Sequence, residues 1–112
     1  MKEPVKAPFY ACIYEMACKI ARDHGYALAV HGSMGRDLDF IAIPWQEECS
    51  ERNDLIRAMK DAFEWCKEDW PDERIEKDIT YRPHGRSGIV IMMDFQHTCY
   101  IDLSIINKKP AK

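Results

Sequence analysis

A chain of 112 residues is long enough to bury the core of one domain. Its formal net charge of −3 excludes general electrostatic binding to nucleic acids or membranes, because such binding needs a positive field. Five cysteines without a CxxC pair exclude a disulfide framework and predict reduced core thiols in a cytoplasmic protein.

The first part of the chain predicts one helix and two strands. Apolar side chains recur at helical spacing from Pro8, which suits a first helical turn, to Gly25, which suits a C-terminal cap. A short apolar strand follows over residues 26–31, then a glycine-rich turn over residues 32–36. The second strand is predicted to run from about Leu38 to Ile43.

The rest of the chain predicts a second helix and three strands. The helix follows the polar segment 46–52, with Ser50 or Asn53 as its N-cap residue, and Trp70-Pro71-Asp72 ends it. The strands are predicted over residues 78–82, 89–95 and 99–106. This order predicts an α+β domain: a mixed sheet of about five strands with two main helices packed on one face. The apolar runs are too short to cross a bilayer, so no membrane partner is expected.

Two aspartates open the second predicted strand. Side chains alternate between the faces of a strand, so Asp37 and Asp39 point the same way. Neighbouring carboxylates repel each other, and a shared divalent cation would neutralise them. The preceding turn, which contains Gly32 and Ser33, offers backbone N–H groups to a phosphate. The stretch therefore predicts a site for a metal ion and a phosphate.

A third aspartate interrupts the apolar pattern of the last predicted strand. Asp102 needs a partner there, because burying an unpaired charge is costly. If this strand lies beside the strand of Asp37 and Asp39, three carboxylates meet at one point of the sheet, which fits two-metal phosphoryl or nucleotidyl transfer. The alternative is a structural ion pair between Asp102 and either Arg36 or Arg82.

Basic residues near the two turns fit a phosphate site. Arg36 precedes the first acid, and Arg82, His84 and Arg86 flank the later turn. Guanidinium groups suit phosphate oxygens, so Arg36, His84 and Arg86 are candidates for nucleotide or phosphate binding. A solvated hairpin tip is the alternative for His84 and Arg86. His31 is either a general base near neutral pH or a satisfied histidine at a strand end.

Three short motifs together resemble the polymerase-β-type nucleotidyltransferase superfamily, whose pattern is hG[GS], Dh[DE]h and h[DE]h. They are Gly32-Ser33, Asp37-Leu38-Asp39 and the acid within Tyr100-Ile101-Asp102-Leu103. The resemblance implies a small palm domain in which the Gly-Ser turn holds a nucleoside triphosphate. It also implies that Asp37 and Asp39 hold two Mg²⁺ or Mn²⁺ ions, with Asp102 acting on the attacking nucleophile and completing the metal site.

The size of the chain is similar to that of minimal nucleotidyltransferases, which include antitoxins that pair with HEPN toxins and modify them with nucleotides. The chain also resembles a group of phage and bacterial proteins that carry HGS…RDLD…IPW, PHGR and YIDLS blocks. The matching blocks here are 31–33, 36–39, 43–45, 83–86 and 100–104. The resemblance therefore implies a protein or nucleic-acid acceptor or partner.

Two functions stay open at this point. The first is a minimal metal-dependent nucleotidyltransferase, which transfers a nucleotide from a nucleoside triphosphate to a protein or nucleic-acid acceptor. The second is a catalytically inactive module of the same fold that binds a protein or nucleic-acid partner. Clustered acids favour the enzyme, because a structural sheet gains nothing from them. The short spacing favours the module, because only residues 34–36 separate Ser33 from Asp37, where active family members have a longer helical turn.

Overall fold

Five strands form one mixed sheet in the computed structural model, which describes residues 3–31, 38–96 and 99–107. The elements in chain order are α1 (Glu3–Asp23), β1 (Tyr26–His31), β2 (Leu38–Pro44), α2 (Arg52–Phe63), α3 (Asp72–Asp78), β3 (Thr80–Arg82), β4 (Arg86–Met92) and β5 (Tyr100–Ile106). The strand order is β1-β2-β5-β4-β3, with β2 and β5 parallel and the other neighbours antiparallel. The predicted α+β class with a mixed sheet of about five strands is confirmed.

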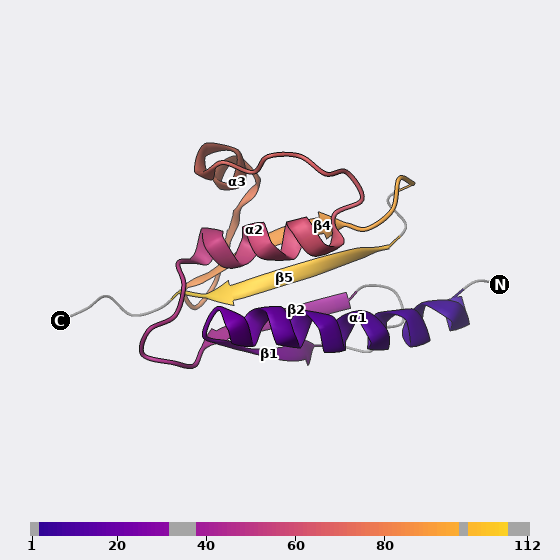
Figure 1. Ribbon diagram of the computed structural model, residues 1–112, viewed down its shortest axis with the longest axis horizontal. Coiled ribbons are helices and arrows are strands. Elements are labelled where there is room, and N and C mark those ends of the chain that lie inside the picture. Colours follow the sequence, from indigo (N-terminus) through magenta and orange to yellow (C-terminus); the bar gives the residue numbers. More distant parts are fainter. Residues whose placement is uncertain (1–2, 32–37, 97–98, 108–112) are drawn as a thin grey trace.

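The two long helices cover the same face of this sheet. Figure 1 shows α1 and α2 side by side in front of the strands, with α3 beyond α2. Buried side chains of the two central strands form the sheet side of the core: Leu38, Phe40, Ala42, Ile101, Leu103 and Ile105. Buried helical side chains complete it: Tyr10, Ala17, Ala21, Leu55, Ile56 and Met59. Each large apolar side chain buried in this way contributes about 1.5–3 kcal/mol.

The opposite face of the sheet, here called the open face, is the one that α1 and α2 leave uncovered. Because side chains alternate along a strand, the residues between the core positions point to it. On β2 these are Asp39 and Ile41, and on β5 they are Asp102 and Ser104. The same alternation that buries the core therefore brings the acidic residues together on the open face.

Both long helices begin elsewhere than predicted. The first begins at Glu3 rather than near Pro8, and Pro4 satisfies the preference for proline in a first turn. The second begins at Arg52, and its N-cap position is occupied by Glu51, without a capping side-chain hydrogen bond. Ser50 does not cap this helix because its hydroxyl is hydrogen-bonded to His24 Nδ1, at 2.9 Å.

The segment around α3 also differs from the prediction. The prediction placed the end of a helix at Trp70-Pro71-Asp72, but a new helix starts there, with Pro71 at its N-cap position. The following strand is shorter than predicted and begins at Thr80.

Cysteine burial also differs from the prediction of core thiols, since Cys49 is buried but Cys12 is exposed.

A glycine shapes the tight connection between α1 and β1. Gly25 has a φ of 85°, which side chains other than glycine rarely adopt. Its carbonyl accepts hydrogen bonds from the backbone N–H groups of Trp45 and Gln46, at 2.9 and 3.1 Å. A Cβ at this position would also lie 2.8 Å from Cys49. Gly25 therefore holds the C-terminal end of α1 against the residues that follow β2.

Candidate functional site

Asp39 of β2 and Asp102 of β5 lie directly opposite each other on adjacent parallel strands. Neighbouring strands are about 4.8 Å apart, so the two carboxylates share one small area of the open face. His31 of β1 is paired with Asp39 on its other side. The three residues therefore form a row across β1, β2 and β5. The condition on which the sequence-based hypothesis depended, that the strand of Asp102 lies beside the strand of Asp39, is met.

A hollow of about 220 Å³ lies over this row. The residues that line it are His31, Asp39, Phe40, Ile41, Arg82, Arg86, Asp102 and Ser104. Two carboxylates and two guanidinium groups thus face one small space. Such a space suits a ligand that carries both negative groups and a cation, for example a metal-bound phosphate.

Arg82 pairs with the carboxylate of Asp102. Its Nη2 donates to Asp102 Oδ1 at 2.8 Å, and its Nη1 donates to Ser104 Oγ at 2.6 Å. Of the two ion-pair partners considered for Asp102, the structure thus shows Arg82, and Arg36 lies outside the described residues. The guanidinium supplies the positive charge that a mid-strand aspartate needs.

The turn between β3 and β4 contributes one of its two candidate residues to the hollow. Arg86 lines it, and its Nε donates to the backbone carbonyl of Pro83 at 3.1 Å. His84 is exposed, has a φ of 66°, and is not among the residues that line the hollow. The turn therefore presents Arg86 to the carboxylates, while His84 lies in the exposed turn.

The pair of carboxylates has the oxygen chemistry that Mg²⁺ and Mn²⁺ prefer. Within the described residues, no group of three or more His, Cys, Asp or Glu side chains is placed to hold a metal ion. The predicted third carboxylate, Asp37, lies outside the described residues, as do Gly32 and Ser33 of the predicted phosphate turn. The described chain therefore supplies two of the three predicted carboxylates, and their chemistry fits a divalent cation.

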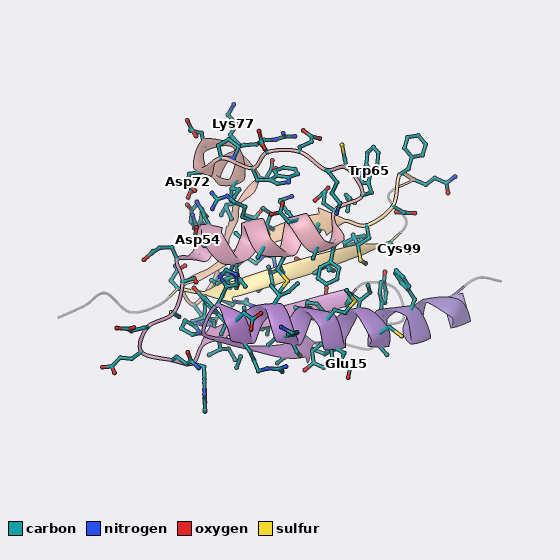
Figure 2. All side chains as sticks on the ribbon, viewed as in Figure 1. Glu15, Asp54, Trp65, Asp72, Lys77 and Cys99 are labelled. Carbon is teal, nitrogen blue, oxygen red and sulfur yellow. The ribbon has the colours of Figure 1, made fainter. Side chains whose placement is uncertain are left out.

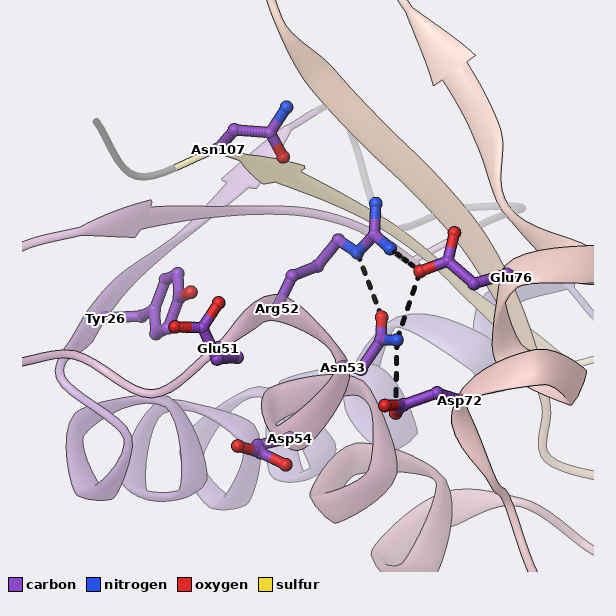
Figure 3. Close-up of a pocket in the computed structure, with 8 residues that line it drawn as sticks. All are labelled: Tyr26, Glu51, Arg52, Asn53, Asp54, Asp72, Glu76 and Asn107. Carbon is purple, nitrogen blue, oxygen red and sulfur yellow. Dashed lines mark hydrogen bonds and ion pairs between the residues drawn. The ribbon is translucent and has the colours of Figure 1, made fainter. Parts of the chain in front are cut away.

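A larger hollow, of about 520 Å³, lies where α2 meets α3 (Figure 3). Its polar groups bind one another: Asn53 Nδ2 donates to Asp72 and Glu76 at 3.3 and 3.2 Å, and Arg52 pairs with Glu76. Hydrogen bonds from Arg57 and Asn53 hold the pKa of the Asp72 carboxyl below its usual range. These carboxylates already have partners across the joint, so we assign this hollow a structural role.

Figure 2 labels two acids of the same joint, Asp54 on α2 and Asp72 on α3. Arg57 lies between them, and its two Nη atoms donate to Asp54 at 2.9 Å and to Asp72 at 2.7 Å. Ion pairs this exposed contribute little individually, about 0–1 kcal/mol. Their role is to orient α3 on α2 rather than to hold a ligand.

Sequence reasoning did not include Arg82 or Ser104 among the site residues. Arg82 was considered as a basic residue beside the later turn and as a possible ion-pair partner of Asp102, but it was not named as a site residue. A signal for Ser104 was present, since a small hydroxyl two residues after Asp102 must share its face of a strand. Alternation along β5 would have predicted that Asp102 and Ser104 lie together on one face of the sheet.

Comparison with protein-family models, with curated proteins and with solved structures gives no match for this chain. In the described part of the chain, no helix is both long enough and apolar enough to cross a membrane.

Proposed function

We propose that this chain is a minimal nucleotidyltransferase, which transfers a nucleotide from a nucleoside triphosphate to a protein or nucleic-acid acceptor with Mg²⁺ or Mn²⁺. The observation that carries the proposal is the register pairing of Asp39 with Asp102 beside two arginines. Like charges placed opposite each other on neighbouring strands are destabilising, so a purely structural sheet has no use for them. The resemblance of the surrounding motifs to the polymerase-β-type superfamily points to the same chemistry.

The proposed reaction assigns a task to each described side chain. An acceptor hydroxyl forms a bond to the α-phosphorus, the bond to the β-phosphate oxygen breaks, and pyrophosphate leaves. The hydroxyl proton passes to a base on the open face, for which Asp102 and His31 are the candidates. Arg86 binds phosphate oxygens. The divalent cation, when bound by Asp39 and its neighbours, neutralises the charge of the triphosphate.

The proposed acceptor is a hydroxyl of a protein or nucleic acid, since the hollow is open to solvent on a bare sheet face. The proposed location is the cytoplasm, where nucleoside triphosphates are available and thiols stay reduced. Asp37, Gly32, Ser33 and Arg36 belong to the same proposal as metal and phosphate contacts.

Thermal melting tests this proposal without knowledge of the acceptor. Wild type and Asp39→Asn are melted with Mn²⁺ or Mg²⁺ and each nucleoside triphosphate, and with each component alone. A ligand at about 100 times its Kd stabilises the native state by about 2.7 kcal/mol, so a shift of several degrees is expected for wild type. Asp39→Asn is expected to lose the shift. A shift of equal size in both proteins would overturn the assignment of Asp39.

A second candidate function is an inactive module of the same fold that binds a protein or nucleic acid. The ion pair between Arg82 and Asp102 favours it, because a guanidinium occupies the carboxylate that catalysis needs. The short segment between Ser33 and Asp37 favours it as well. A wild-type protein whose melting temperature responds to no combination of metal and triphosphate would support this candidate over the enzyme.

A further inference from the structure

The guanidinium of Arg82 lies flat across β4 and ends on β5. Arg82 projects from β3, and the residue between it and its partners is Gly88 of β4, which is paired with Ser104. From there Arg82 reaches Ser104 Oγ at 2.6 Å and Asp102 Oδ1 at 2.8 Å. The side chain of Arg82 therefore starts on β3 and crosses β4 to reach the carboxylate of Asp102 on β5.

Gly88 makes this path possible. A Cβ added at Gly88 would overlap the guanidinium of Arg82, meeting Cζ, Nε and Nη2 at less than contact distance. Glycine inside a strand often marks a close approach by another group, and here the group is a charged side chain. The guanidinium of Arg82 thus lies in a slot. Gly88 forms the base of this slot, and Ser104 and Asp102 accept the hydrogen bonds that hold Arg82 in one position.

We propose that Arg82 is a lock on Asp102: while the guanidinium sits in this slot, it blocks a divalent cation from Asp102, and an anionic phosphate ligand opens the site by drawing the guanidinium away. Arg82 is thereby a positioning residue. The inference deepens the proposed function and rests on it for the identity of the opening ligand, the triphosphate. It adds that metal binding at Asp102 follows triphosphate binding.

The charges explain the order of binding. With Arg82 in place, the carboxylate is already neutralised and one of its oxygens is already an acceptor, so a divalent cation meets a positive neighbour and a weakened ligand. A triphosphate offers the guanidinium several oxygens in the fork geometry that it prefers. Arg82 then moves from one anion to another without becoming an unpaired charge, and Asp102 is released for the cation.

Binding of Mn²⁺ alone, without nucleotide, tests the lock. Free Mn²⁺ is measured by electron paramagnetic resonance for wild type, Arg82→Ala and Gly88→Ala, with folding checked by circular dichroism. The guanidinium of Arg82 lies 2.8 Å from Asp102 and repels a cation at the same carboxylate, so Arg82→Ala is expected to bind Mn²⁺ at least about tenfold more tightly. Gly88→Ala keeps the net charge but displaces the guanidinium, and it is expected to change in the same direction.

Two further variants separate the lock from a general charge effect. Lys77→Ala removes a positive charge from an exposed residue of α3 that does not line the hollow over Asp39 and Asp102, and it should leave Mn²⁺ affinity unchanged. Arg86→Ala removes a charge that lines the same hollow without contacting Asp102, and its gain should be clearly smaller than that of Arg82→Ala. Equal gains in the two arginine variants, together with none in Gly88→Ala, would overturn the lock.

The lock and the proposed function fail in different ways. If wild type binds Mn²⁺ alone as tightly as Arg82→Ala and Gly88→Ala do, the lock is wrong while nucleotide binding is untouched. If Arg82→Ala gains Mn²⁺ affinity but the wild-type protein never responds to Mn²⁺ with triphosphate, Arg82 is still the cation that blocks Asp102. The proposed function and the opening of the lock by a triphosphate are then overturned, whereas the block of Asp102 by Arg82 stands.

Discussion

At the scale of a single residue, we expect the charge of Asp39 to lower the stability of the metal-free protein. It faces Asp102 across the β2–β5 pair, and Asp102 already has Arg82 as its partner. Like charges opposite each other on neighbouring strands typically destabilise a sheet, by about 0.2–1 kcal/mol. A residue whose charge weakens the fold but suits a cation is typical of a site kept for binding rather than for stability.

Removing that charge is therefore expected to stabilise the protein in the absence of metal. Asp39→Asn, melted in a chelator, should gain about 0.5 kcal/mol, which corresponds to a rise of about 2–4 °C for a domain of this size. Asp69→Asn, a change of the same charge on an exposed loop, is the control and should leave the melting temperature unchanged. A clear fall for Asp39→Asn would show that Asp39 belongs to a structural contact and that repulsion is not its main interaction.

A second residue-scale prediction concerns Tyr26 at alkaline pH. Its ring is almost fully buried, and its hydroxyl donates to the Ser50 carbonyl at 2.8 Å. Burial, together with the nearby Cys49, raises the pKa of the phenol well above its ordinary value. The folded protein therefore keeps the proton above pH ~10, where the unfolded chain releases it, and stability falls as the pH rises through this value.

Tyr26→Phe should remove part of this alkaline loss. At neutral pH the variant is expected to lose about 1 kcal/mol with its hydrogen bond, whereas its stability should depend less on pH above ~10. Urea unfolding from pH 7 to 11 measures both effects. Tyr81→Phe, at an exposed tyrosine, is the matched control. Parallel alkaline losses in wild type and Tyr26→Phe would contradict this explanation.

At the scale of elements, α3 depends on a single apolar contact with the core. The helix has seven residues, too few to be stable alone, and Ile75 is its buried residue. The other attachments to α2 are polar: ion pairs of Arg57 with Asp72 and of Arg52 with Glu76, and hydrogen bonds from Asn53, and largely exposed contacts of this kind contribute little individually. The position of α3 therefore rests mainly on Ile75.

Ile75→Ala is expected to cost about 2–5 kcal/mol and to loosen α3 before the rest of the chain unfolds. Hydrogen exchange measured by mass spectrometry should show faster exchange over 72–78, with little change in β2 and β5. Lys77→Ala on the same helix is the control, since Lys77 is exposed. Uniformly faster exchange in all elements would instead mean that α3 and the sheet open as one unit.

Local signals in the sequence were enough to predict most elements. The strand over 26–31 has the predicted bounds, because its apolar run lies between Gly25 and the glycine-rich turn. The helix at 72–78 was missed because Pro71 was taken only as a breaker. Proline before two acids is also typical of a helix start, and Asp72 and Glu73 lie in the first turn.

The site required information that single elements do not carry. Alternation along β5 predicted that Asp102 needs a partner, but its register against Asp39 depends on a parallel pairing between strands that lie far apart in sequence. The choice between a metal and Arg82 as that partner also depends on the position of β3, at the far edge from β1. Sequence patterns therefore predicted the residue types of the site, whereas tertiary structure determines their partners.

At the scale of the whole molecule, two of the hollows that the described residues form contain clusters of carboxylates. One lies on the open face over Asp39 and Asp102, and the other is the larger hollow between α2 and α3. More carboxylates line the larger hollow, so the number of acidic residues alone would predict a divalent cation at that hollow. As part of the proposed function we place the cation on the open face instead, because Asp39 and Asp102 lie in register on adjacent strands, whereas the carboxylates of the larger hollow join α2 to α3.

The location of bound Mn²⁺ tests this central claim most directly. In nuclear magnetic resonance spectra of the ¹⁵N-labelled protein with a nucleoside triphosphate, Mn²⁺ broadens the amide signals of nearby residues. We predict that signals around Asp39 and Asp102 disappear first, while those of 72–78 persist, and that Asp39→Asn abolishes the effect. First loss of signals around Asp54 and Glu76, or no selective loss at any residue, would contradict the proposed site.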